Sequence, residues 1–204
     1  TTFRCEERYT DGRHPDKVSF AKNIEDDLSR RDFTVNAIAY DPISHELVDP
    51  FNGQTDLKAK LIKAVGDPLE RFSEDGLRPM RACRFAATLN FKIEQKTFDA
   101  IKKTLDIFKK VSPERTHDEI IKMMASDKPS IGIEYLRESG LLNIIIPELL
   151  EGAGVEQPKP YHVWDVYYHN IYSCDFGPKD KPLLRLALLF HDISKPECKL
   201  DETF

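Results

Sequence analysis

The sequence predicts an α+β fold, with strands confined to the beginning of the chain and helices filling the remainder. Residues 1–66 mix short strand-like runs with Asp-Pro and Asn-Gly turn signals. From about residue 67 the strand signal disappears, and apolar residues recur at helical spacing, as Phe98, Ile101, Leu105 and Phe108 do. Strands followed by a run of helices are typical of α+β proteins.

Composition and charge exclude several classes of protein. The chain has 204 residues, enough for a sizeable core and one or two domains. Its net charge of −5 argues against indiscriminate phosphate binding, while leaving room for a local basic surface. No apolar run is long enough for a transmembrane helix and no signal peptide is visible, so we expect no membrane partner.

The cysteines and the two ends add two expectations. Cysteines are scattered along the chain without any close pair, which favours a reduced cytoplasmic protein over a disulfide or zinc framework. The chain begins "TTFRCEE" without Met and stops shortly after a motif-dense region. We therefore expect a fragment of a longer protein.

Individual elements follow from local signals. We expect strands at residues 37–41, 45–49 and 60–66, with one helix between Asp26 and Ala39. In the helical part, Ser112 is a candidate N-cap before Pro113, and Gly140 is placed where a helix would stop. Two further helices are predicted within residues 161–175 and 182–196.

The stretch "DLSRRDFTVNAIAYDP" places charges directly before an apolar run. Arg30 and Arg31 are planar, permanently charged donors suited to phosphate or carboxylate. Asp32 is an acceptor for an arginine or for a ribose hydroxyl. The alternative is a helix N-terminus, in which Asp32 caps, the arginines are solvated and Asn36 satisfies a local backbone group. These residues alone leave both interpretations open.

A second polar stretch is "SEDGLRPMRACRF". In a continuous helix, Glu74, Arg78 and Arg81 would form one ridge. Asp75 beside Arg78 offers an acceptor next to several donors, a set able to pair with the Watson–Crick edge of a base. Solvated ion pairs are the alternative. Pro79 moves the expected helix start to Asp75 or later, and an N-cap role would partly occupy the Asp75 carboxylate.

The two predicted helices near the end of the chain carry side chains of the types that bind metal ions. His169 lies on the first, and His191 with Asp192 follows the apolar run of the second. Two imidazoles and a carboxylate suit a divalent metal, whereas a core histidine satisfied by an aspartate is the alternative.

A basic cluster lies between these stretches. It is either a solvated helix face or a track for a nucleic-acid backbone. Its members are Lys102, Lys103, Lys109, Lys110 and Arg115.

Taken in order, these segments resemble one family. "TTFR", "DGRHPDKVSF", "DLSRRDFTVNAIAYDP", "LVDPFNGQTDL", "EDGLRPMRACRF" and "SPERTHDEI" resemble the class II (bacterial-type) tRNA nucleotidyltransferases and poly(A) polymerases. The resemblance covers at least residues 1–125, and "YHVWDVYYHNI" with "LLRLALLFHDISKP" extends it to an HD-type helical domain. It implies the C-terminal part of a polymerase-β-like head in residues 1–66, an all-helical nucleotide- and RNA-binding neck in 67–127, and a helical body with a partial HD domain in 128–204.

This family adds CMP and AMP, from CTP and ATP, to the tRNA 3′ end, and protein side chains select the nucleotide. Carried over to this sequence, the resemblance implies that Arg31 and Asp32 contact the ribose and phosphates, supported by Arg30 and Asn36. It further implies that Asp75 and Arg78 pair with the base. The remaining implied members orient Arg78 or face phosphate, and they are Glu74, Arg81 and Arg84.

The sequence departs from the family pattern at two places. The Gly-rich turn and the paired-aspartate strand that hold two Mg²⁺ ions are missing, so we expect those catalytic aspartates upstream of Thr1 and none within the chain. The chain alone is then expected not to transfer a nucleotide. The HD pattern also needs a further downstream aspartate, for which Asp201 is too close. A second divalent metal at His169, His191 and Asp192 therefore remains an expectation.

Alternatives remain beside the tRNA nucleotidyltransferase interpretation. Within the family, the protein adds only C or only A, or is a poly(A) polymerase. Outside it, the chain is an HD-type metal-dependent phosphohydrolase or a non-catalytic RNA-binding fragment. The sequence specifies neither the nucleotides added nor the oligomeric state.

Overall fold

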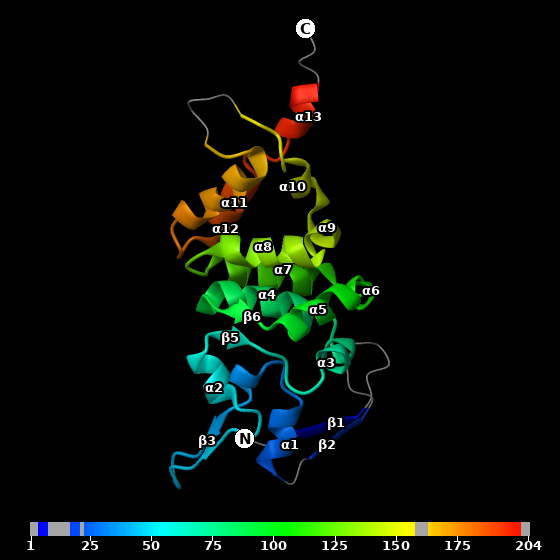
Figure 1. Cartoon of the computed structure of the whole chain (residues 1–204), viewed down its shortest axis with the longest axis vertical. Helices are drawn as coiled ribbons and strands as arrows, with labels where there is room; N and C mark the ends of the chain where they lie inside the picture. Colours follow the sequence, from blue (N-terminus) through cyan, green and yellow to red (C-terminus); the bar gives the residue numbers. More distant parts are fainter. Residues whose placement is uncertain (1–3, 8–16, 21–22, 158–162, 201–204) are drawn as a thin grey trace. The chain divides into compact units, whose positions relative to one another are not determined.

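Two groups of elements form in the structure, a computed structural model that describes residues 4–7, 17–20, 23–157 and 163–200 (Figure 1). The first unit comprises Thr1–Ala82 and Phe91–Ser112, and the second comprises Cys83–Asn90 and Pro113–Phe204. The boundary between them lies inside helix α4 (Arg78–Leu89). The three-part division expected from the sequence stays a prediction.

Three two-stranded sheets, all in the first unit, account for the strands of the described residues. Strand β1 (Arg4–Glu7) pairs antiparallel with β2 (Lys17–Phe20), and β3 (Ala39–Tyr40) pairs antiparallel with β4 (Leu47–Val48). Strand β5 (Leu61–Ile62) pairs in parallel with β6 (Lys92–Ile93). The strands expected at residues 37–41, 45–49 and 60–66 are confirmed as two-residue strands, and the α+β class is confirmed with them. Strand β6 was not predicted, because it lies where the strand signal had disappeared.

The helices of the first unit are short. They are α1 (Ile24–Ser29), the 3-10 helix η1 (Thr34–Asn36), α2 (Gly53–Lys58), α3 (Pro68–Glu74), the start of α4, α5 (Gln95–Lys103) and α6 (Leu105–Phe108).

The single helix expected between Asp26 and Ala39 is wrong. Helix α1 ends at Ser29, and the chain then pairs with the segment after β5, since the Val65 N–H donates to the Asp32 carbonyl at 3.1 Å. Phe33 forms an isolated antiparallel bridge with Ala64 and is fully buried. Pairing with the segment after β5 holds the backbone extended here, and burial of the Phe33 ring adds apolar stabilisation.

A small core supports this pairing. Leu28, Ala37 and Val65 are buried together, and the partly buried apolar residues packed against them are Ile24, Ala39, Val48 and Phe51. The segment that carries Arg30, Arg31 and Asp32 therefore rests on a fixed apolar base.

The second unit is helical. It contains the end of α4 followed by α7 (Pro113–Met124), α8 (Pro129–Ser139), α9 (Leu142–Ile145), α10 (Pro147–Glu151), α11 (Val166–Phe176), α12 (Pro182–Phe190) and α13 (Lys195–Leu200). The predicted start at Pro113 is confirmed. The predicted stop at Gly140 is also confirmed, because this residue follows α8 with a φ of 88° that favours glycine. Both helices predicted near the end are present as α11 and α12.

No described helix is long and apolar enough to cross a membrane.

Candidate functional site

The two arginines after α1 share one buried carboxylate. Asp27 is only 6% exposed. Its Oδ1 accepts from Arg30 Nε at 3.1 Å and from Arg30 Nη2 at 2.5 Å. Its Oδ2 accepts from Arg31 Nη2 at 2.9 Å, while 46% of the Arg31 side chain stays exposed. Arg31 is thus anchored at one end and open to solvent at the other.

Asp32 is buried, and both of its oxygens are occupied. Oδ1 accepts from the Phe33 N–H at 2.9 Å and from Asn36 Nδ2 at 3.0 Å. Oδ2 accepts from Arg81 Nε at 2.8 Å and from Arg81 Nη2 at 2.5 Å. Four donors fill the sites that a carboxylate offers. Asp32 therefore holds Arg81 and Asn36 in place, which is one of the two roles that the sequence left open for it.

The helix is interrupted between Glu74 and Arg78, in agreement with the helix start expected at Asp75 or later, so Glu74, Arg78 and Arg81 do not form one continuous helical ridge. Helix α3 ends at Glu74, Asp75 has extended backbone (φ −142°, ψ 110°), and α4 begins at Arg78. The Asp75 Oδ1 accepts from the Leu77 N–H at 3.0 Å, so the carboxylate is partly used in the turn, as a capping role predicted. Asp75 itself is half-buried.

Gly76 lets this turn approach α6 closely. A Cβ at this position would lie 2.9 Å from the carbonyl oxygen of Ile107, closer than real Cβ atoms come to a backbone atom. The glycine is required for this packing rather than for a special φ.

The Arg78 guanidinium is fixed from three directions. Nη1 donates to Glu74 Oε2 at 2.5 Å and to the Arg71 carbonyl at 2.8 Å, and Nη2 donates to the Arg30 carbonyl at 3.1 Å. Arg71 Nη1 donates to the same Glu74 oxygen at 2.8 Å. The Nε–H of Arg78 has no protein partner among the residues described. Arg78 is therefore a buried, oriented donor that still has a hydrogen to offer.

Arg84 differs from the other arginines of these two stretches. It belongs to the second unit, where its Nε donates to Glu119 Oε2 at 2.5 Å. The Arg84 side chain is 11% exposed and that of Glu119 2%, and the guanidinium also lies 3.8 Å from the Phe85 ring centroid. The geometry gives Arg84 a structural partner, and its expected contact with phosphate stays a prediction.

The predicted metal ligands lie together in the second unit. Their donor atoms all lie within 4.8 Å of one another, and no other such group of three occurs among the described residues. The Nε2 atoms of His169 and His191 are 3.0 Å apart, and each is 3.4 Å from Asp192 Oδ2. His191 Nδ1 lies 2.6 Å from the Leu188 carbonyl, so it donates and leaves Nε2 to the cluster. Asp201 lies outside the described residues.

A lysine already accompanies this cluster. Lys195 Nζ lies 2.6 Å from Asp192 Oδ2. Partial burial opposes the ionisation of Asp192, but the hydrogen bond from Lys195 and the nearby histidines outweigh it, and the pKa of Asp192 is lowered. Two imidazole nitrogens and an ionised carboxylate fit a divalent metal, although Lys195 competes with it for Asp192.

Most members of the basic cluster are exposed to solvent. Lys102 and Lys103 end α5, and Lys109 and Lys110 follow α6, all of them exposed. Lys109 pairs with the exposed Asp106 at 2.8 Å, while Arg115 belongs to the second unit. The solvated face and the phosphate track thus both stay predictions.

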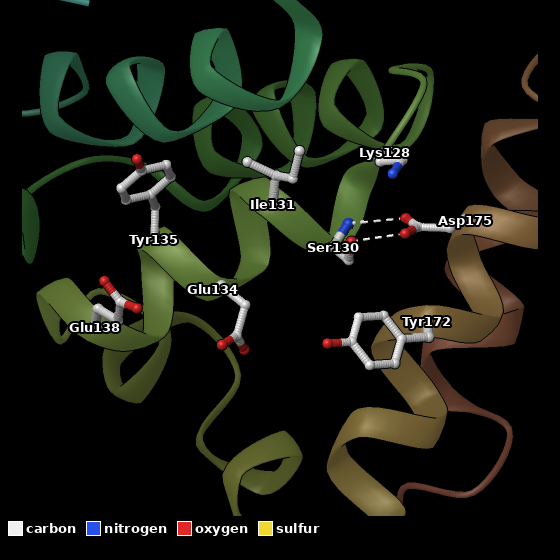
Figure 2. A pocket seen from close by; sticks show the side chains of 8 residues that line it. All are labelled: Lys128, Ser130, Ile131, Glu134, Tyr135, Glu138, Tyr172 and Asp175. Carbon is white, nitrogen blue, oxygen red and sulfur yellow. Dashed lines mark hydrogen bonds between the residues drawn. The ribbon is translucent and has the colours of Figure 1, made fainter. Parts of the chain in front are cut away.

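A pocket of about 470 Å³ lies between α8 and α11 (Figure 2). Glu134 and Tyr172 face it from the two helices, and Asp175 accepts from the N–H and the hydroxyl of Ser130 across one end. Glu138 adds a further carboxylate. Three acidic side chains make this pocket unsuitable for a nucleotide triphosphate.

Sequence reasoning missed two residues of the first unit. Asp27 holds both arginines after α1, and Arg71 shares Glu74 with Arg78. The signal for Asp27 was its position three and four residues before Arg30 and Arg31, the spacing of side chains that meet on a helix.

Comparisons with known families match two parts of the chain. Residues 1–63 match the family described as "Poly A polymerase head domain". Residues 90–152 match the one described as "Probable RNA and SrmB- binding site of polymerase A".

Curated relatives share about half of the aligned residues. A CCA-adding enzyme of Lactococcus lactis subsp. cremoris (strain MG1363) is 50% identical over 139 residues, which are 68% of this chain and 34% of the relative. A CCA-adding enzyme of Streptococcus suis (strain 05ZYH33) is 48% identical over 149 residues, 73% of this chain and 36% of the relative. The chain thus spans about a third of the length of these relatives.

Solved structures with a similar fold include a CCA-adding enzyme and a tRNA nucleotidyltransferase. The CCA-adding enzyme of Bacillus stearothermophilus in complex with CTP matches 98% of this chain and 50% of its own, with a TM-score of 0.66 and 28% identity. A tRNA nucleotidyltransferase complexed with a primer tRNA and an incoming ATP analog matches 83% of this chain and 50% of its own, with a TM-score of 0.61 and 28% identity.

Proposed function

We propose that this chain, which belongs to the family of tRNA nucleotidyltransferases and poly(A) polymerases, forms the nucleotide-binding part of a tRNA 3′-terminal nucleotidyltransferase. The protein that carries it transfers CMP and AMP from CTP and ATP to the tRNA 3′ end. The observation that carries the proposal is the fixed Arg78 guanidinium, with an open Nε–H, whose Nη2 is bonded to the carbonyl of Arg30, the residue before Arg31.

In this proposal Arg78 and Asp75 pair with the base. Glu74 and two backbone carbonyls accept both hydrogens of Arg78 Nη1 and one of Arg78 Nη2. These bonds orient the donors of Arg78 that have no protein partner among the described residues. A base with ring acceptors accepts from Arg78, and its exocyclic amine donates to Asp75. Because protein side chains, and not a nucleic-acid template, pair with the base, the fixed geometry of these side chains determines which nucleotide is selected.

Arg31 takes the phosphates in the same scheme. Its side chain is 46% exposed and permanently charged, and a guanidinium forms bidentate hydrogen bonds with phosphate oxygens. Asp32, Asn36 and Arg81 act behind it as one bonded group. When tRNA is bound, its terminal 3′ oxygen attacks the α-phosphorus, and the bond to pyrophosphate breaks.

Mg²⁺ would supply charge stabilisation and activation of the 3′ hydroxyl in this reaction. Asp27 and Asp32 do not suit it, because both are buried and bonded to arginines. Glu74 is bonded to Arg71 and Arg78, and this proposal uses Asp75 for the base. We therefore assign Mg²⁺ to none of the described carboxylates at this site. In the same proposal, residues 1–66 form part of the head, residues 67–127 the neck, and residues 128–204 the HD-type body. The protein acts in the cytoplasm, where its tRNA substrate is found.

Replacing Arg78 tests this assignment. In the gene product that carries this chain, Arg78→Ala should change the preference between CTP and ATP, measured as the ratio of their kcat/KM values on tRNA that lacks its terminus. The exposed Lys58→Ala, on α2, is the matched control and should leave the ratio unchanged. An unaltered ratio in Arg78→Ala would refute base pairing by this residue.

The products separate the alternatives within the family. A poly(A) polymerase extends RNA with a run of A when only ATP is supplied. Enzymes that add only C or only A stop after their own nucleotide. Sizing the products made with CTP alone, ATP alone and both therefore distinguishes these activities.

The His169, His191 and Asp192 cluster favours a second candidate, an HD-type metal-dependent phosphohydrolase. The metal would be held by two imidazoles and one carboxylate, and we expect Mn²⁺ or Ni²⁺ to be retained after purification. Lys195→Ala should raise the metal content, since it removes the competing ammonium, and His191→Ala should lower it. Metal content that neither substitution changes would refute the site, and hydrolysis of p-nitrophenyl phosphate that follows the metal would support the activity.

A further inference from the structure

We propose that Asp27 is a positioning residue, which fixes Arg31 in the orientation that binds the triphosphate of the incoming nucleotide. The inference rests on the proposed function of the site. It adds a residue to which neither the motif pattern nor the comparisons give a role.

The geometry of Asp27 supports such a role. A carboxylate that is 6% exposed is costly unless it is paired, and Asp27 is paired with two arginines. Each arginine has its own oxygen: Oδ1 takes Arg30, and Oδ2 takes Nη2 of Arg31 at 2.9 Å. Arg31 Nε and Nη1 have no protein partner within the described part of the chain. One carboxylate thus holds one corner of the Arg31 fork and leaves its other donors available.

Charge and entropy both favour this arrangement for an anionic ligand. Asp27, Arg30 and Arg31 together carry a net positive charge, so the carboxylate does not cancel the attraction for phosphate. A free arginine loses much rotamer freedom when it binds a ligand, whereas an anchored one has lost part of it on folding. Asp27 therefore contributes to affinity without contacting the nucleotide.

The base-pairing side is structurally separate from this effect. Arg78 bonds to the backbone carbonyl of Arg30, not to its side chain. That backbone is also held by the Arg31 N–H, which donates to the Leu28 carbonyl at 3.2 Å. Removing the Asp27 charge should therefore weaken nucleotide binding without changing which base is preferred.

A double-mutant cycle in the intact gene product tests the inference. The Kd for CTP is measured by calorimetry for Asp27→Asn, Arg31→Ala and the double variant. We expect each single substitution to raise the Kd about tenfold, as expected for a charge-assisted contact. The double variant should bind no more weakly than Arg31→Ala, because Asp27 acts through Arg31. Glu25→Gln, the same change at an exposed position of α1, should have no effect.

Further readouts separate positioning from a loss of structure. The preference for CTP over UTP should be unchanged in Asp27→Asn, and Asp27→Glu, which retains the charge, should recover part of the affinity. If Asp27→Asn does not fold, Asp27→Glu enters the cycle in its place. Unchanged CTP affinity, or effects of Asp27 and Arg31 that multiply in the double variant, would overturn the inference. Failure of the unsubstituted protein to bind CTP would instead contradict the proposed function.

Discussion

Arg84 and Glu119 form the ion pair whose disruption we expect to cost the most stability. Both side chains are nearly out of water, at 11% and 2% exposure, and Glu119 Oε2 accepts from Arg84 Nε. Removing one partner of a buried pair leaves the other uncompensated, at a cost of about 3–5 kcal/mol. Lys122 also donates to Glu119 at 3.0 Å, and glutamine retains one acceptor. We therefore expect Glu119→Gln to cost about 3 kcal/mol, the lower end of that range.

Thermal and urea unfolding followed by circular dichroism provide the assay. For a chain of this length, about 3 kcal/mol corresponds to a fall in Tm of roughly 6–12 °C. Arg84→Met should cost a similar amount. Replacing both residues, as Arg84→Met with Glu119→Leu, should recover most of the lost stability, because an apolar pair of similar volume leaves no buried charge without a partner. Glu138→Gln, at an exposed position of α8, is the matched control.

The same variants distinguish a structural Arg84 from one that contacts phosphate. If Arg84 is structural, both single variants should have a lower Tm with little change in the Kd for CTP. A Tm within about 2 °C of the unsubstituted protein for Glu119→Gln would refute the energetic reasoning. A weaker Kd for CTP in Arg84→Met at unchanged Tm would support the phosphate contact that the family resemblance implies.

Three further outcomes are expected. Gly53→Ala should cost about 3 kcal/mol or more in urea unfolding, since the new Cβ would lie 2.1 Å from the Thr34 carbonyl oxygen and the backbone cannot yield cheaply; a cost under about 1 kcal/mol would contradict this. Asp67 accepts from Lys96 and from the first N–H groups of α3, and these bonds lower the pKa of its carboxyl group. The stability lost in Asp67→Ala should thus be largest at neutral pH and should shrink as pH falls through this lowered pKa, whereas a loss independent of pH would show that ionisation is irrelevant. Burial raises the pKa of Cys83, so a Cys5→Ser protein should label at the exposed Cys198 within minutes and at Cys83 only on unfolding, as peptide mapping would report; early labelling of Cys83 would contradict its burial.

The sequence predicted the helical second unit well, for reasons that are local. Pro113 and Gly140 mark helix ends through their own backbone preferences, and both are found where they were expected. The first unit was harder, because two-residue strands such as β6 carry almost no periodic signal. The extended backbone at Phe33 depends on pairing with Ala64, which is distant in sequence.

The site residues illustrate the same limit. Pro79 indicated a helix start at Asp75 or later, and α4 does begin at Arg78, whereas the contacts of Arg78 with a base stay a prediction. The direction in which Arg78 donates depends on the Arg30 carbonyl, 48 residues earlier in the chain. Asp32 bonds Arg81, 49 residues later, which is one of the two roles left open for it, and its contact with the nucleotide stays a prediction. Such pairings depend on the folded arrangement of the first unit, and no local pattern of residues contains them.

The interruption between α3 and α4 has a consequence for how this protein tolerates insertions and deletions. Surface turns usually accept an extra residue at small cost, because loop-closure entropy grows slowly with length. Here one added residue between Glu74 and Arg78 would displace the start of α4 from the turn that Asp75 closes and that Gly76 packs against α6. Arg78 and Arg81 would then leave Glu74 and Asp32, their present partners. We expect libraries of functional variants to contain substitutions in this turn but no change in its length.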